Sequence, residues 1–258
     1  MQDDQAVGWR KYVGVCVAAA RASIRGLDAA IMPRCCVFCG AECEPTEGYF
    51  CDGCAEDLPW NENQCARCAQ PIVAAMPAGR NCADCLQRPQ PFVAAAAPLK
   101  YEFPIDAAIR ALKFHRRLDY VPAFGAILTA VMPSLPADID ALLPVPLHWR
   151  RHAMRGFNQA TELCAPVAKA TGLPIVRNAR RARSTPYQSG LNARERRRNL
   201  RSAFAIQGAL EGSHVLIVDD VITTGETCRQ LAHVLRRSGV RQVSVLAVAR
   251  ASQGPKRD

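Results

Sequence analysis

Two adjacent carboxylates followed by a threonine-rich turn have the clearest potential for chemistry in this sequence. Asp219 and Asp220 come directly after the apolar run Val215–Val218, and the turn Thr223-Thr224-Gly225 comes next. A run that is apolar throughout predicts a buried strand of a parallel sheet. Because ligands of open α/β sheets bind at the carboxyl ends of the strands, the two carboxylates are predicted to face a ligand.

The turn after the carboxylates is predicted to hold a phosphate group. Backbone N–H groups and hydroxyls at the start of a helix bind phosphate, and a glycine lets the backbone approach it closely. The predicted phosphate ligands are Val221, Thr223, Thr224, Gly225, Glu226 and Thr227. Asp219 and Asp220, the candidate catalytic residues, would bind vicinal ribose hydroxyls and help to hold Mg²⁺ through water. The plain alternative is a helix N-cap with solvated charges, while Walker-type and dinucleotide-binding glycine motifs are missing from the sequence.

Eight of the thirteen cysteines form four Cys-x-x-Cys pairs, a spacing typical of zinc knuckles. Two pairs complete a site of four thiolates, so the sequence predicts two zinc ions. The first site is assigned to Cys36, Cys39, Cys51 and Cys54, and the second to Cys65, Cys68, Cys82 and Cys85. A closed four-cysteine site leaves no open position, which makes the zinc structural. A cross-braced pairing fits the spacing as well, and iron–sulfur ligation or redox chemistry are the competing interpretations.

Two arginine-rich segments lie between the cysteine pairs and the carboxylates. The first, Pro146 to Asn158, follows a short apolar strand and is predicted to be a loop suited to binding pyrophosphate. Its candidate ligands are Pro146, His148, Arg155, Gly156 and Asn158. The second, Arg177 to Arg201, contains nine arginines, which suits a loop closing over a phosphorylated ligand or a contact with a nucleic-acid backbone. A solvated basic face is the plain alternative for both.

The composition suits a globular protein with an anionic partner. The chain has 258 residues, a formal net charge of +10 and 49% hydrophobic residues. Thirteen cysteines would indicate disulfides in a secreted protein, but the N-terminal segment lacks the pattern of a signal peptide. No apolar run approaches the roughly 20 residues of a membrane span. We therefore expect a cytoplasmic protein without a membrane span, whose cysteines bind metal.

The pattern after the cysteine pairs alternates strands with helices and predicts an α/β fold, a parallel sheet flanked by helices. Strands are expected at Val93–Tyr101, Ala141–Val145, His214–Asp219 and Gln242–Ala249. Helices are expected at Pro104–Phe114, Tyr120–Met132, Asn158–Thr171 and Glu226–Ser238. The expected organisation is a helical extension (1–34), a double zinc ribbon (35–90), the α/β domain (91–251) and a basic tail (252–258).

Together these motifs resemble one known family. The segment Val215 to Gly225 resembles the signature with which type I phosphoribosyltransferases bind 5-phosphoribosyl diphosphate (PRPP). With the four cysteine pairs and the segments Leu142–Ala160 and Ser184–Leu200, the chain is similar to the ComF/ComFC competence-protein family, which includes GntX-like proteins. The match runs from about residue 33 to residue 250. It implies a type I phosphoribosyltransferase fold behind a double zinc ribbon, with Pro146–Asn158 facing pyrophosphate.

The resemblance implies a PRPP-binding protein with a role in DNA uptake during natural transformation. As an enzyme, it would transfer the phosphoribosyl group from PRPP to an unidentified acceptor and release pyrophosphate. The alternative is a non-catalytic protein that binds single-stranded DNA or a competence helicase and keeps the PRPP pocket as a regulatory site; a sensor of PRPP is a third interpretation. The candidate residues of the second basic segment are Gln188, Arg196, Arg197, Arg198 and Asn199.

Overall fold

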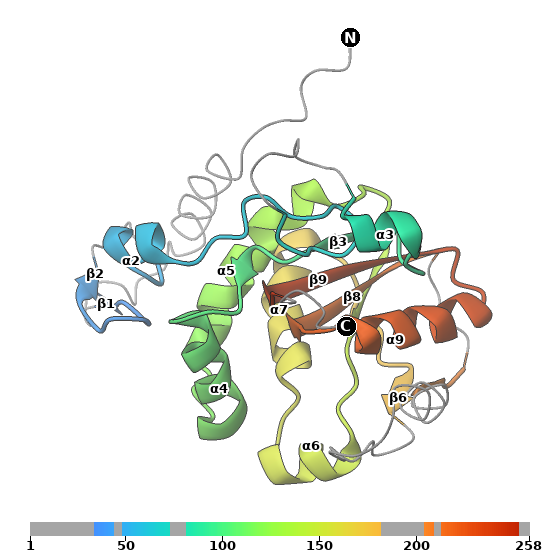
Figure 1. Ribbon diagram of the computed structural model, residues 1–258. Helices are drawn as coiled ribbons and strands as arrows, with labels where there is room; N and C mark the ends of the chain where they lie inside the picture. The colour runs from blue at the N-terminus through green and yellow to red at the C-terminus, as the bar shows by residue number, and fades with distance from the viewer. Residues whose placement is uncertain (1–33, 44–47, 73–80, 182–203, 209–212, 253–258) are drawn as a thin grey trace, which may run out of the picture.

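The computed structural model describes the chain outside residues 1–33, 44–47, 73–80, 182–203, 209–212 and 253–258 (Figure 1). Nearly all of the expected N-terminal helical extension lies outside the described residues. The same holds for Gln188 and for residues 196–199 of the second basic segment.

A parallel sheet forms the centre of the protein, as the sequence predicted (Figure 1). Its strand order is β3-β9-β8-β5, and each neighbouring pair is parallel. The strands are β3 (Ala94–Ala96), β5 (Ala141–Pro144), β8 (His214–Ile222) and β9 (Gln242–Arg250), and the short β4 (Leu99–Lys100) pairs with the end of β9. The expected strand at Val93–Tyr101 is therefore divided into β3 and β4.

Helices cover both faces of the sheet (Figure 1). They are α4 (Ile105–His115), α5 (Tyr120–Val131), which continues into the 3₁₀ turn η2 (Met132–Ser134), α7 (Gln159–Thr171) and α9 (Glu226–Arg237). Side chains of a strand alternate between faces, so Leu216 and Val218 of β8 pack in the cluster of α5 and α7, and Val215 and Ile217 pack in the cluster of α9. This double coverage explains why the run Val215–Val218 of β8 is apolar throughout.

The cysteine-rich segment packs against the sheet. It contains β1 (Arg34–Cys35), β2 (Glu42–Cys43), α2 (Asp52–Asp57) and α3 (Ala83–Gln87). Phe50 and Leu58 belong to the same hydrophobic cluster as α5. The buried Asn61 side chain donates to the carbonyl oxygens of Ala69 and Ala97, at 2.9 and 3.0 Å, and so joins the segment to the chain between β3 and β4. These contacts hold the cysteines in fixed positions relative to the sheet.

One local prediction was wrong, and one pair of strands was not predicted. The segment Pro146–Phe157, expected to be a loop, contains the helix α6 (Trp149–Arg155). The His148 side chain accepts from the backbone N–H of Arg150 in its first turn, and Gly156, with φ of +78°, ends it in the left-handed conformation common at helix C-termini. In the second basic segment, β6 (Ala179–Arg181) pairs antiparallel with β7 (Phe204–Ile206), which follows that segment; neither strand was predicted.

Candidate functional site

Asp219 and Asp220 both lie within β8, which extends past the predicted end at Asp219. The strand continues to Ile222 because β9 pairs with it as far as Ile222↔Arg250. Asp220 is almost fully buried, and Asp219 is partly exposed. The carboxylates therefore project from a rigid strand at its carboxyl end, where the sequence analysis expected a ligand.

Lys113 neutralises one of the two carboxylates. Its ammonium group reaches from α4 and lies 2.8 Å from Oδ2 of Asp220, and their side chains are 20% and 5% exposed. This role of Lys113 was not predicted from the sequence because its partner is on a distant strand. The available signal was its place beside Leu112, on the edge of the buried face of α4.

Burial and the charge of the neighbouring Asp220 both raise the pKa of Asp219. Oδ1 of Asp219 accepts a hydrogen bond from the backbone N–H of Asp220, at 2.9 Å. Burial, and then the charge of Asp220, raise the pKa of Asp219 to about 8. A carboxyl group in this condition gains from a bound cation, which would stabilise its ionised form.

The predicted phosphate turn leads directly into α9. Thr223 and Thr224 are exposed, and Gly225 has φ of +75°, a left-handed conformation that favours glycine. The backbone N–H of Glu226 lies 3.4 Å from Oγ1 of Thr224. Val221 and Thr227 are half-buried on either side of the turn. An anion at this end of the helix can therefore accept hydrogen bonds from the N–H groups of the first turn of α9 and from the hydroxyls of Thr223 and Thr224.

The 146–158 segment supplies one guanidinium close to the carboxylates. Burial lowers the pKa of Arg155, and the nearby charge of Asp220 opposes this shift. The Arg155 guanidinium lies 4.9 Å from the ring centre of Phe114, and Nη1 donates to Oε1 of Gln159 at 3.1 Å. Phe114 follows Lys113 on α4, so the last turn of this helix contacts both the carboxylate strand and the basic segment.

The other predicted pyrophosphate ligands of residues 146–158 contact the surrounding protein. His148 is buried, and its Nδ1 accepts from the backbone N–H of Arg150 at 3.3 Å. Burial, followed by the charges of Arg181 and Arg150, lowers the pKa of His148, which favours the neutral ring. Asn158 caps α7 through Oδ1 and donates to the carbonyl oxygen of Val145 at 3.0 Å. Pro146 and Gly156 contribute to the cavity wall beside α6, together with Asn158.

The eight cysteines form two separate groups in sequence order, not a cross-braced arrangement. Cys36, Cys39, Cys51 and Cys54 make the first group, and Cys65, Cys68, Cys82 and Cys85 the second, with all sulfur atoms of a group within 4.8 Å of one another. Cys39 and Cys51 are 3.8 Å apart at sulfur, and Cys68 and Cys82 are 3.7 Å apart. Four sulfurs at about 2.3 Å from a tetrahedral zinc ion would be about 3.8 Å apart. Both groups therefore fit zinc.

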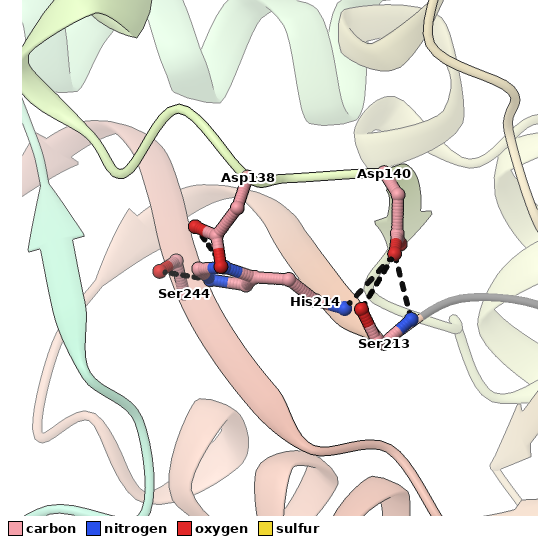
Figure 2. Close-up of polar contacts among 5 residues, drawn as sticks. All are labelled: Asp138, Asp140, Ser213, His214 and Ser244. Carbon is pink, nitrogen blue, oxygen red and sulfur yellow. Dashed lines mark hydrogen bonds and ion pairs between the residues drawn. The ribbon is translucent and has the colours of Figure 1, made fainter.

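A Ser-His-Asp chain lies at the opposite end of β8 and is structural (Figure 2). His214 Nδ1 is 2.8 Å from Oδ1 of Asp138, and Nε2 is 2.8 Å from Oγ of Ser244. The arrangement is that of a nucleophile, base and acid, but Ser244 is 0% exposed and His214 is 1% exposed, so no substrate can reach the hydroxyl. Asp140 adds hydrogen bonds to Ser213 and to the backbone of His214. The network fastens the segment before β5 to the start of β8.

Comparison with known proteins adds the family to this geometry. Residues 27–86 match the model of the double zinc ribbon domain, and residues 153–258 match that of the phosphoribosyl transferase domain. The DNA utilization protein YhgH of Salmonella typhimurium is 33% identical over 226 residues, which cover 85% of this chain and 98% of that protein. The chain belongs to the ComF family.

The chain is also similar to a second curated protein and to two solved structures. Competence protein F of Haemophilus influenzae is 29% identical over 229 residues, which cover 84% of this chain and 96% of that protein. Among solved structures, the glutamine PRPP amidotransferase of B. subtilis is 23% identical with a TM-score of 0.35, over 48% of this chain and 25% of that one. Adenine phosphoribosyltransferase of Leishmania tarentolae is 18% identical with a TM-score of 0.34, over 55% of this chain and 60% of that one.

The two matched regions of this ComF-family chain hold most of the predicted site. The double zinc ribbon match contains both cysteine groups, and the phosphoribosyl transferase match contains Asp219, Asp220 and the turn before α9. Lys113 lies between the matched regions. In the part of the chain that the structure describes, no helix has the length and apolar character needed to cross a bilayer.

Proposed function

We propose that this protein binds PRPP together with Mg²⁺ at the carboxyl end of β8 and acts in the handling of DNA by the cell. The observation that carries the proposal is the pair Asp219 and Asp220 on a rigid strand that leads into an exposed turn and the start of α9. The DNA role is supported by relatives that are called DNA utilization protein and competence protein. Zinc ligation by thiols suits a reducing compartment, so we propose a cytoplasmic location.

Each group of PRPP has a partner in this arrangement. The 5-phosphate would accept from the N–H groups at Thr224–Thr227, and the ribose hydroxyls would donate to Asp219 and Asp220. Mg²⁺ prefers carboxylate oxygen and water, and it would meet the carboxyl group whose pKa is raised. The pyrophosphate would extend toward Arg155, whose guanidinium can stabilise the charge that develops when the bond to C1 breaks. The two cysteine groups would each hold a structural zinc ion.

PRPP titration tests this proposal. Calorimetry of the full chain with PRPP and Mg²⁺ should give one site per chain, and removal of Mg²⁺ should weaken binding at least tenfold because the diphosphate charge is then unshielded. In parallel, release of pyrophosphate should be followed over a panel of bases and amines. Release that requires an acceptor identifies a phosphoribosyltransferase, and release without an acceptor indicates hydrolysis of PRPP. Binding without release supports a regulatory role for the pocket. A chain that binds no PRPP at millimolar concentration contradicts the proposal.

Single-stranded DNA is the second ligand that we propose, at the exposed face of α6. The Trp149 side chain is 64% exposed, and the Arg150 guanidinium lies 5.3 Å from the centre of its ring. An exposed aromatic ring beside arginines can stack with a base while the guanidinium groups meet phosphates. A helicase partner and the arginines at 196–198 belong to the same hypothesis, but those arginines lie outside the described residues.

Replacing Trp149 with alanine should lower the affinity for single-stranded DNA about tenfold, because one stacked base contributes roughly 1–3 kcal/mol. Fluorescence anisotropy with a labelled oligonucleotide measures this, and binding should also weaken steeply with salt. Met154→Ala is the matched control, since Met154 lies on the same helix and is 86% exposed but has no ring. Equal affinities of the two variants would show that α6 is not the binding surface.

A further inference from the structure

We propose that the second cysteine group sets the conformation of the phosphate turn through Arg250, so that PRPP affinity depends on zinc in the second site and not on zinc in the first. This inference rests on the PRPP binding proposed above. It assigns Arg250 as a positioning residue, which acts on the ligand through the backbone of the turn.

Arg250 joins the second cysteine group to the turn by direct hydrogen bonds. It is the last residue of β9, and it is only 3% exposed. Its Nε donates to the carbonyl oxygen of Cys68 at 3.1 Å, and its Nη1 donates to that of Ile222 at 2.8 Å and to that of Thr223. One guanidinium thus connects a metal-ligand residue with the two peptide units that precede Thr224.

The charge of Arg250 links its position to the metal. A buried guanidinium is costly unless its hydrogen bonds and its charge are both compensated. Arg250 donates to the backbone of Cys68 and lines the same small cavity as Cys68 and Cys82. Zinc bound by four thiolates is formally a dianion, so the filled second site supplies a counter-charge close to this guanidinium. The hydrogen bonds to carbonyl oxygens then fix the orientation of the Arg250 guanidinium group.

The two regions also face each other across a small cavity. A cavity of about 110 Å³ has Cys68, Cys82 and Cys85 on one wall and Thr224, Gly225 and Arg250 on another. None of the first-group cysteines lines it. The first group instead packs toward α5, where the rings of Phe38 and Tyr120 are 5.9 Å apart. The first group therefore provides an internal control for general effects of zinc loss.

Loss of zinc from the second site should release the turn. Arg250 would lose its counter-charge and its fixed partner at Cys68, and the carbonyl groups of Ile222 and Thr223 would lose their donor. The N–H groups that follow them would then point less uniformly at the 5-phosphate. Coupling between two binding sites is reciprocal, so bound PRPP must also retain zinc in the second site.

Cysteine variants test the first half of the coupling. Cys82→Ser removes a ligand from the second site, and Cys51→Ser removes the equivalent ligand from the first; both cysteines precede a short helix and are partly exposed. Zinc analysis should show one ion lost in each. PRPP affinity by calorimetry should fall about tenfold or more in Cys82→Ser and change less than twofold in Cys51→Ser. Equal losses in the two variants, or no loss in Cys82→Ser, would overturn the inference.

Zinc release tests the reciprocal half and does not depend on stability alone. With a chromogenic chelator, PRPP should slow the release of one of the two zinc ions of the unaltered chain severalfold and leave the other unchanged. In Arg250→Met, which lacks the guanidinium, PRPP should slow neither ion, and Arg250→Lys should fall between because it keeps the charge without the fork. Slowed release that persists in Arg250→Met contradicts the role of Arg250.

Failure of the proposed function can be separated from failure of this inference. If the unaltered chain binds PRPP and Cys82→Ser binds it equally well, the coupling is wrong and PRPP binding stands. If the unaltered chain binds no PRPP, amide hydrogen exchange at residues 223–227 decides the inference by itself. Faster exchange in Cys82→Ser than in Cys51→Ser supports it, and equal exchange overturns it.

Discussion

Asp219→Asn is expected to reduce PRPP affinity about a hundredfold and at the same time to make the unliganded protein more stable. The substitution keeps the shape of the side chain but removes a charge that would bind ribose and Mg²⁺. The same charge is unfavourable without ligand, because burial and Asp220 raise its pKa to about 8 from an ordinary 3.8. Relief of such a site is typically worth about 1 kcal/mol, which raises Tm by about 3 °C.

The pH dependence of this effect has a definite sign. A carboxyl group with a raised pKa binds its proton more tightly in the folded protein, so its contribution to stability is fully present below about pH 4. That contribution is lost as the pH rises toward about 8. Thermal unfolding from pH 5 to 8 should therefore show a decline in the unaltered chain that is smaller in Asp219→Asn, while PRPP affinity of the unaltered chain rises over the same range.

Asp106→Asn is a suitable control for Asp219→Asn. Asp106 pairs with Arg110 at the surface of α4, four residues apart, and should affect neither PRPP affinity nor the pH profile. If Asp219→Asn binds PRPP as well as the control does, the carboxyl end of β8 is not the ribose site.

Lys113→Met is expected to destabilise the fold by about 2 kcal/mol. Removing one partner of a largely buried pair leaves the other charge uncompensated, which costs about 3–5 kcal/mol in a fully buried pair, and the partial exposure of Lys113 reduces this. The lost lysine also leaves Asp220 free to oppose the ionisation of Asp219. Urea unfolding at pH 7 measures the change, which corresponds to a Tm lower by about 6 °C.

A double-mutant cycle distinguishes the ion pair from simple packing. Asp220→Asn alone should also destabilise, because it leaves Lys113 without its partner. The combination of Lys113→Met with Asp220→Asn should be less destabilised than the sum of the two single variants by at least 1 kcal/mol. Strictly additive losses would mean that the 2.8 Å contact carries no net pairing energy.

The sequence predicted the parts of the site that are local in the chain. The run from Val215 to Gly225 contains its own strand, carboxylates and turn, so hydrophobic pattern and residue type were enough to place them at the end of a parallel strand. Paired spacing was likewise enough to find the cysteines. The exact end of the strand was missed because β8 is extended by pairing with β9, and that pairing is not visible in β8 alone.

The missed residues act through partners that are remote in sequence. Arg250 bonds to Cys68 across 182 residues, and Lys113 meets Asp220 only because α4 packs beside the sheet. Helix α6 was missed because its arginines suggested a binding loop and because histidine is not a common N-cap residue. The signal for this helix was Gly156 at its end.

The Asp138–His214–Ser244 network gives β8 two ends with opposite tolerance for change. At its start, the hydrogen bonds of His214 join three segments of the chain. Tighter packing or a crosslink at this end should therefore leave the proposed ligand site undisturbed. At its other end, the ionised Asp219 carboxylate costs folding energy, and substitutions selected only for heat resistance will tend to remove this charge. A thermostability screen without a PRPP-binding step is therefore expected to enrich Asp219 variants that lack the proposed PRPP site.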